Sequence, residues 1–141
     1  MIYMQIKFYD NVSDELIKYA VIISRYHGKN VFCKHKKRDT LEIPGGHRED
    51  GEALIDTARR ELYEETGALS YQLTPLFVYS CLFENGEESF GMLYLADIDE
   101  FDTELHFEIE KIVLLDDLPK RWTYPLIQPI IYEELIRRKI I

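Results

Sequence analysis

Apolar residues lie along one side of a predicted helix between Gly46 and Gly67. On a wheel of about 3.6 residues per turn, Leu54, Ala58 and Leu62 fall within roughly 80° of one another and form a core-facing stripe. A glycine turn precedes this segment, and Gly67 suits the left-handed position that commonly ends a helix. The pattern predicts an amphipathic helix packed against a core.

Segments rich in Val, Ile, Phe and Tyr flank this helix on both sides and are predicted to be strands. They are Gln5–Tyr9, Lys18–Tyr26, Asn30–His35, Phe77–Phe83, Glu88–Ile98 and Glu108–Leu115. Turn residues at 27–30 and 84–87 predict two hairpins, and Pro129–Arg138 is predicted to form a second helix with proline in its first turn. This order of elements predicts an α/β fold in which a mixed β-sheet packs between helices.

Three carboxylates of the first helix lie beside its apolar stripe. On the wheel, Glu61 and Glu65 flank Leu54 on the inward side, and Glu64 lies about 60° from Glu61. Because an unpaired carboxylate is costly to remove from water, this cluster requires a cation. Glutamate oxygens and a carbonyl of the nearby Gly-Gly turn suit Mg²⁺ or Mn²⁺, and Mg²⁺ commonly shares its ligand shell with substrate phosphates. The cluster therefore predicts a divalent-cation site that binds a polyphosphate.

The segment from Gly46 to Ala68 resembles the Nudix box, G-x5-E-x7-R-E-U-x-E-E-x-G-U, in which U is a bulky aliphatic residue. The matching residues are Gly46, Glu52, Arg60, Glu61, Leu62, Glu64, Glu65 and Gly67. Ala68 departs from the motif, because it is smaller than the usual residue at the last position. By this resemblance residues 1–141 form a single Nudix hydrolase domain, an α/β/α sandwich that cleaves nucleoside diphosphates linked to another moiety.

The helical spacing and the resemblance together predict roles for individual residues. Two or more Mg²⁺ (or Mn²⁺) ions would be held by the Gly45 carbonyl and by the carboxylates of Glu61, Glu64 and Glu65. Arg60 lies one turn before Glu64 and is expected to pair with it and orient it. Glu52 lies on the far side of the wheel and is expected to steady the loop or the start of the helix rather than to bind metal.

The attacking water requires a general base, which in relatives is either the carboxylate at the Glu61 position or one from a loop beyond the box. In this chain Glu108 and Glu110 are the candidates for the second role. Solvated charges at the end of a strand are an equally good interpretation of either residue.

The run at residues 41–46, LEIPGG, resembles the LEFPGG run of MutT-type members that hydrolyse 8-oxo-dGTP. Ile43 would then line the base pocket. Arg38 would either grip phosphate or remain a solvated loop charge. Trp122, with Tyr124, would either stack on a nucleobase or pack in the core.

We therefore expect cleavage of a nucleoside triphosphate to the monophosphate and pyrophosphate, with 8-oxo-dGTP as the leading candidate. Thr123 lies where the nearest MutT-like enzymes carry asparagine, which weakens the assignment to oxidised guanine. Two alternatives stay open: hydrolysis of ADP-ribose, a sugar nucleotide or a dinucleoside polyphosphate, and nucleotide binding without turnover. Residues 83–86 lack the marker of the ADP-ribose and dinucleoside-polyphosphate branches, which disfavours both.

The amino-acid composition and charge restrict the classes of molecule that this protein could bind. The 141 residues carry 17 basic and 26 acidic side chains, a net charge of −9, whereas duplex nucleic acid requires a positive surface. No apolar run in the sequence approaches the length of a membrane span. Cys33 and Cys81 form no metal-type or redox-type pair, so buried thiols in a reducing compartment are expected. These features predict a cytoplasmic enzyme with a small nucleotide substrate, as a monomer or homodimer.

Overall fold

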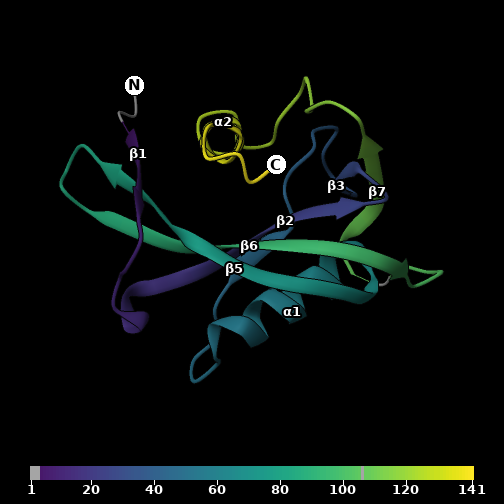
Figure 1. Ribbon diagram of the computed structural model, residues 1–141, viewed down its shortest axis with the longest axis horizontal. Coiled ribbons are helices and arrows are strands. Elements are labelled where there is room, and N and C mark those ends of the chain that lie inside the picture. The colour runs from purple at the N-terminus through teal and green to yellow at the C-terminus, as the bar shows by residue number, and fades with distance from the viewer. Residues whose placement is uncertain (1–3, 106) are drawn as a thin grey trace.

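The computed structural model describes residues 4–105 and 107–141 and shows a mixed β-sheet with one α-helix on each face (Figure 1). The strands are β1 (Met4–Tyr9), β2 (Ile17–Tyr26), β3 (Lys29–His35), β4 (Gly45–His47), β5 (Ala68–Phe83), β6 (Glu88–Phe101) and β7 (Ile109–Leu115). The helices are α1 (Leu54–Thr66) and α2 (Gln128–Arg137), and η1 (Asp14–Leu16) is a short 3₁₀ helix. In Figure 1, α1 lies below the sheet and α2 above it, which confirms the predicted sheet between helices.

The sheet has the strand order β1-β5-β6-β2-β3-β7, and β4 pairs with β2. The pair β2–β6 is parallel and the other pairs among the described strands are antiparallel. Along β2, Ala20 and Ile22 pack in the cluster under α1, whereas Val21 and Ile23 pack in the cluster under α2. Because helices cover both of its faces, this central strand is largely buried.

The predicted stripe on α1 is confirmed in its centre. Ala58 and Leu62 are fully buried, and Leu54 is half-buried at the first turn. The helix ends at Gly67, whose φ of 76° is left-handed and whose N–H donates to the carbonyl of Tyr63. None of the helices in the described residues is long and apolar enough to cross a membrane.

Strand β5 is longer than predicted, because it begins at Ala68 and continues through residues 69–76. This half of the strand was not predicted, because Pro75 interrupts the sequence and because buried and exposed residues do not alternate regularly along it. Irregularities in the pairing with β6, one of them between Pro75 and Val78, accommodate the proline within the strand. Strand β4 was also unpredicted, since it forms inside the expected glycine turn.

Candidate active site

Two adjacent glycines of β4 allow close contacts with two different elements. A Cβ atom on Gly45 would lie 2.6 Å from the carbonyl oxygen of Ala20 on β2, and one on Gly46 would collide with the carboxylate of Glu61. Glycine at position 45 thus allows β4 to lie close to β2, and glycine at position 46 allows it to lie close to α1. The carboxylate of Glu61 therefore lies over the backbone of Gly46.

The backbone of Gly45 also contacts the last turn of α1. Its N–H donates a 3.0 Å hydrogen bond to Oε1 of Glu65. The preceding residue, Pro44, accepts a 2.8 Å hydrogen bond from Ile22 N, so in the alternating antiparallel pattern Gly45 turns its polar backbone groups away from β2. Since the N–H and C=O of an extended residue lie on the same side, the Gly45 carbonyl also faces α1. This is the side on which a metal ligand is expected.

Arg60 joins the carboxylates of this region. Its guanidinium donates 2.8 Å to Oε1 of Glu61 and 3.4 Å to Oε2 of Glu64, so the predicted pairing with Glu64 is confirmed. Its Nε donates a 2.9 Å hydrogen bond to Oε2 of Glu52, and Oγ1 of Thr57 donates a 2.7 Å hydrogen bond to Oε1 of the same carboxylate. These two hydrogen bonds lower the pKa of Glu52 to about 2, and the bond from Arg60 has the larger effect. Glu52 thus holds the beginning of α1, as expected.

Two of the box carboxylates lie in partly desolvated positions. The side chains of Glu61 and Glu65 are 13% and 12% exposed. Burial raises the pKa of both, that of Glu65 to about 8, and outweighs the opposing hydrogen bonds from Arg60 and Gly45. A pair of crowded carboxylates with a carbonyl nearby is an oxygen-only donor set, which fits a hard divalent cation.

A further buried carboxylate, Glu42, was not identified from the sequence. Its side chain is 5% exposed, and Nε2 of His35 lies 2.5 Å from its Oε1 and 3.3 Å from Oε2 of Glu65. Nη1 of Arg38 lies 3.3 Å from the other Glu42 oxygen, so Arg38 is paired although it stays half exposed. The sequence did contain one indication of this buried carboxylate, because Glu42 is an ionisable residue between the apolar residues Leu41 and Ile43.

Beside these groups lies a cavity of about 480 Å³. Charged side chains that line it include Arg38, Glu42 and Glu65. Aromatic side chains that line it include Tyr79, Phe83 and Tyr124. Ile43 lines it as well, and its N–H donates a 2.9 Å hydrogen bond to Oε1 of Gln128, a residue that no pattern in the sequence indicated. The cavity thus joins the carboxylate cluster to an apolar and aromatic surface.

Trp122 packs against other aromatic side chains. Its ring packs edge-on to Phe32 and tilted on Tyr132, with ring centroids 5.6 and 5.9 Å apart. Among the described residues that line the cavity, Tyr124 is present and Trp122 is not. Of the two interpretations, the ring contacts favour core packing for Trp122, and its contact with substrate stays a prediction.

Glu108 and Glu110 lie at the start of β7 and are exposed. The carboxylate of Glu110 pairs with Nζ of Lys34 at 3.2 Å, and the backbone carbonyl of Glu108 accepts a 2.9 Å hydrogen bond from Lys36 N. Neither belongs to the described lining of the cavity. Glu61 accepts a hydrogen bond from Arg60 among the box carboxylates, and the roles of Glu61 and Glu108 as general base stay predictions.

Comparison with known proteins agrees with this site. Residues 16–134 match the NUDIX domain family. A relative from Bacillus subtilis (strain 168), YtkD, provisionally named an 8-oxo-dGTP diphosphatase, is 33% identical over 120 residues, covering 83% of this chain and 73% of that protein. The crystal structure of a mutant of the Bacillus subtilis pyrophosphohydrolase BsRppH matches with a TM-score of 0.80 and 26% identity, covering 98% of this chain and 90% of that one.

A NUDIX hydrolase from Nitrosomonas europaea shares the fold more distantly, with a TM-score of 0.57 and 21% identity, covering 70% of this chain and 72% of that one. The family match extends over most of the chain and includes both α1 and the cavity. The chain belongs to the Nudix hydrolase family and hydrolyses phosphoric anhydride bonds in nucleotide derivatives.

Proposed function

We propose that this chain is a Mg²⁺-dependent cytoplasmic pyrophosphohydrolase that converts a nucleoside triphosphate into a nucleoside monophosphate and pyrophosphate. The observation that carries this proposal is the cluster of Glu61, Glu64 and Glu65 beside a cavity with an aromatic lining. These carboxylates and the Gly45 carbonyl would hold the metal. Bound Mg²⁺ supplies neutralisation of phosphate charge and activation of water.

The chain's own residues would position the reacting groups. Arg60 fixes the carboxylates of Glu61 and Glu64, and Glu61 would accept the proton of the attacking water. The water oxygen forms a bond to one phosphorus and the bridging P–O bond breaks. The leaving group, which is the monophosphate or the pyrophosphate, keeps the electron pair on its oxygen.

The base can be tested by paired substitutions. Glu61→Gln should lower kcat by about 10²-fold or more, whereas Glu108→Gln, an exposed control, should change it little. If Glu108→Gln instead caused the larger loss, Glu108 would be the base and Glu61 only a metal ligand.

We infer that the substrate base lies against Ile43, Tyr124 and Gln128. Oε1 of Gln128 is engaged by the Ile43 N–H, so its Nε2 amino group is the donor left for a ligand. A donor here suits the carbonyl oxygens of an oxidised guanine and compensates for the threonine at position 123. Arg38, half exposed and oriented by Glu42, would contact phosphate.

The leading substrate is 8-oxo-dGTP, which the name of the 33% identical relative supports. The test compares kcat/KM for 8-oxo-dGTP and dGTP at equal Mg²⁺, followed by ADP-ribose, a sugar nucleotide and a dinucleoside polyphosphate. A preference of 10²-fold or more for 8-oxo-dGTP that falls in Gln128→Ala would support the proposal. A ratio near unity would make the protein a general nucleotide pyrophosphohydrolase, and cleavage of ADP-ribose alone would reject the assignment.

A further inference from the structure

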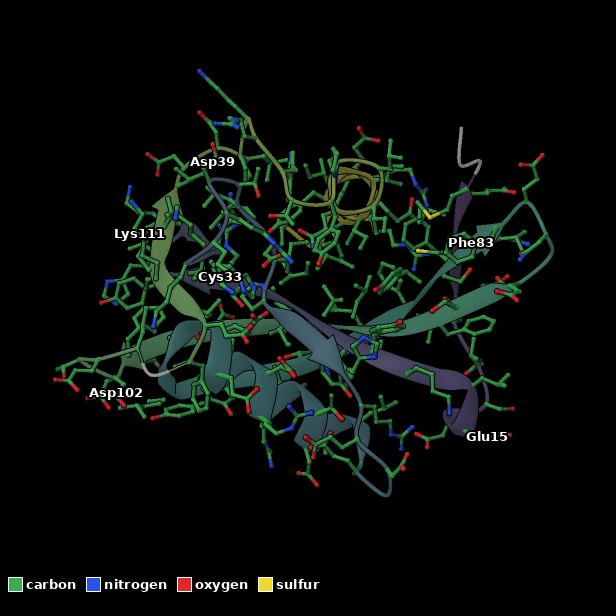
Figure 2. The ribbon with its side chains drawn as sticks, turned by 180° about the vertical axis from the view of Figure 1, so that it is seen from behind. Glu15, Cys33, Asp39, Phe83, Asp102 and Lys111 are labelled. Atoms are coloured by element: carbon green, nitrogen blue, oxygen red, sulfur yellow. The ribbon has the colours of Figure 1, made fainter. Side chains whose placement is uncertain are left out.

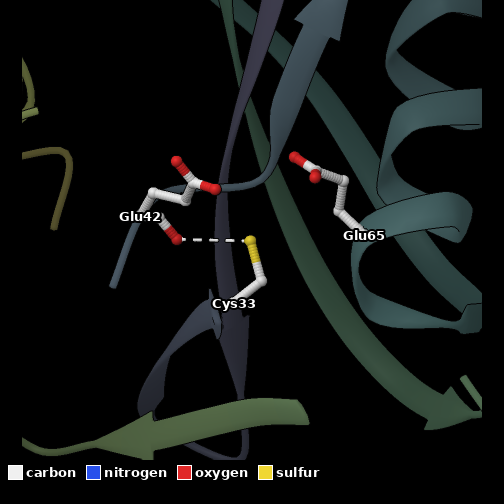
Figure 3. A group of neighbouring side chains, drawn as sticks. All are labelled: Cys33, Glu42 and Glu65. Carbon is white, nitrogen blue, oxygen red and sulfur yellow. Dashed lines mark hydrogen bonds between the residues drawn. The ribbon is translucent and has the colours of Figure 1, made fainter. Parts of the chain in front are cut away.

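Three side chains from separate elements meet beside the carboxylate cluster. Cys33 comes from β3, Glu42 from the segment bridged to it, and Glu65 from the last turn of α1 (Figure 3). One ligand atom of each, the sulfur or a carboxylate oxygen, lies within 4.8 Å of the other two. Figure 2 shows Cys33 in the interior, in contrast to Asp39 and Lys111 at the outer edge.

The backbone holds these side chains in place. Cys33 and Glu42 exchange two backbone hydrogen bonds, of 3.0 and 3.1 Å, and the thiol of Cys33 donates to the Glu42 carbonyl at 3.5 Å. Glu65 is fixed from the other side by the N–H of Gly45. The three donors are therefore preorganised.

An independent sign of a missing ligand is the carboxylate of Glu42. Its Oε1 is buried and makes no hydrogen bond within the described residues, although Nε2 of His35 lies 2.5 Å away without the direction of a hydrogen bond. A buried carboxylate oxygen without a directed partner is costly unless a cation satisfies it. The pair of nearby carboxylates makes a positively charged ligand the natural one.

We propose that Cys33, Glu42 and Glu65 form a thiolate-containing site for a Zn²⁺-like transition-metal ion, distinct from the proposed Mg²⁺ site but sharing Glu65 with it. Mg²⁺ prefers oxygen ligands, whereas Zn²⁺ and Co²⁺ accept sulfur together with carboxylate oxygen. Tetrahedral coordination at bond lengths of about 2.0 to 2.3 Å places donor atoms roughly 3.5 Å apart, a modest contraction of this cluster.

Binding includes the loss of the thiol proton. Burial, with the charges of Glu65 and Glu42, raises the pKa of the Cys33 thiol, so in the metal-free protein the proton stays on sulfur. On binding, the S–H bond breaks, a metal–sulfur bond forms and the proton passes to solvent. A metal ion held here draws Glu65 away from Mg²⁺, so Zn²⁺ should inhibit turnover. This consequence rests on the proposed function, but the binding itself does not.

The binding is tested with Co²⁺ added to the metal-free full-length protein. A thiolate-to-cobalt charge-transfer absorption should appear, persist in the control Cys81→Ser, and vanish in Cys33→Ser. Cys81 is the matched control because it is the other buried thiol. No such absorption at saturating Co²⁺, or the same absorption in Cys33→Ser, would overturn the proposal. Glu42→Gln keeps the thiol, and an undiminished Co²⁺ affinity in this variant would overturn the site even if Cys33→Ser did not fold.

Inhibition is measured as the Zn²⁺ concentration that halves the Mg²⁺-dependent rate, relative to each variant's own Zn²⁺-free rate. Cys33→Ser should raise this concentration at least tenfold, and Cys81→Ser should not. Cobalt absorption without Zn²⁺ inhibition would support the site and overturn the sharing of Glu65. Cobalt absorption in a protein inactive on every nucleotide would leave the site intact and reject the proposed function.

Discussion

The N–H of Gly45 on β4 donates a 3.0 Å hydrogen bond to Oε1 of Glu65 in the last turn of α1. This bond joins the strand before the helix to the end of the helix. It also favours the charged form of the Glu65 carboxylate, which burial disfavours. The neighbouring glycine, Gly46, leaves the space that the carboxylate of Glu61 occupies. Two adjacent glycines therefore position two carboxylates, each by a different mechanism.

This difference predicts opposite effects of two adjacent substitutions. Gly46→Ala places a methyl group against the end of the Glu61 side chain, which can rotate away, so kcat should fall tenfold or more with little change in Tm. Gly45→Ala places its methyl group 2.6 Å from the backbone carbonyl of Ala20, which cannot move freely, so stability should fall by about 1–3 kcal/mol. Thermal melting and steady-state kinetics of both variants check this. Equal losses of stability would show that Glu61 cannot rotate away.

Activity should require a divalent cation and the cation should bind more tightly as pH rises. In the metal-free protein the pKa of Glu65 is about 8, so Mg²⁺ must displace a proton at lower pH. The apparent Kd for Mg²⁺ should therefore fall by up to about tenfold per pH unit below pH 8 and level off above it. Calorimetric titration at pH 6.5, 7.5 and 8.5 measures this. A pH-independent Kd, or full turnover in excess chelator, would contradict the metal assignment.

The metal-free protein should lose stability as pH rises from about 5 to 8. The folded pKa of Glu65 is above its unfolded value, and those of Glu61 and Glu42 are raised too, so in this window the folded state binds more protons than the unfolded state. The lowered pKa of Glu52, about 2, acts in the opposite direction but only at more acidic pH. Melting in chelator should give a higher Tm at pH 5.5 than at pH 8, and Mg²⁺ should reverse the order.

The variant Glu65→Gln serves as the control for this pH effect, because it removes the titrating group that contributes most. Its Tm in chelator should depend less on pH than that of the natural protein. An unchanged pH dependence would place the responsible protons elsewhere.

Substitutions in α1 should affect either catalysis or stability, depending on which side chain is changed. Glu64→Gln or Glu65→Gln should lower kcat by orders of magnitude with little loss of stability, because like-charge crowding is relieved. Leu62→Ala should instead cost about 2–5 kcal/mol, because Leu62 is fully buried and truncation leaves a cavity. Denaturant unfolding and kinetics on the same samples distinguish the two. Small, equal effects of all three changes would remove the site from this helix.

The sequence by itself determined the elements whose pattern is local. Ala58 and Leu62 are buried as their spacing predicts, and Gly67 ends the helix with positive φ. The pairing of Arg60 with Glu64 also followed from helical spacing alone. These features depend on the geometry of one helix, which is the same in any protein, so they can be derived without knowledge of the fold.

Only the tertiary structure decided which elements face one another. Trp122 and Tyr124 are close in sequence, yet the first packs on Phe32 and the second lines the cavity, because the path of the loop orients each ring. Cys33 and Glu42 gave no metal pattern in the sequence, but strand pairing and the packing of α1 bring both beside Glu65. Periodicity reports which face of an element is buried, whereas its neighbours depend on long-range register and packing, which no local spacing encodes.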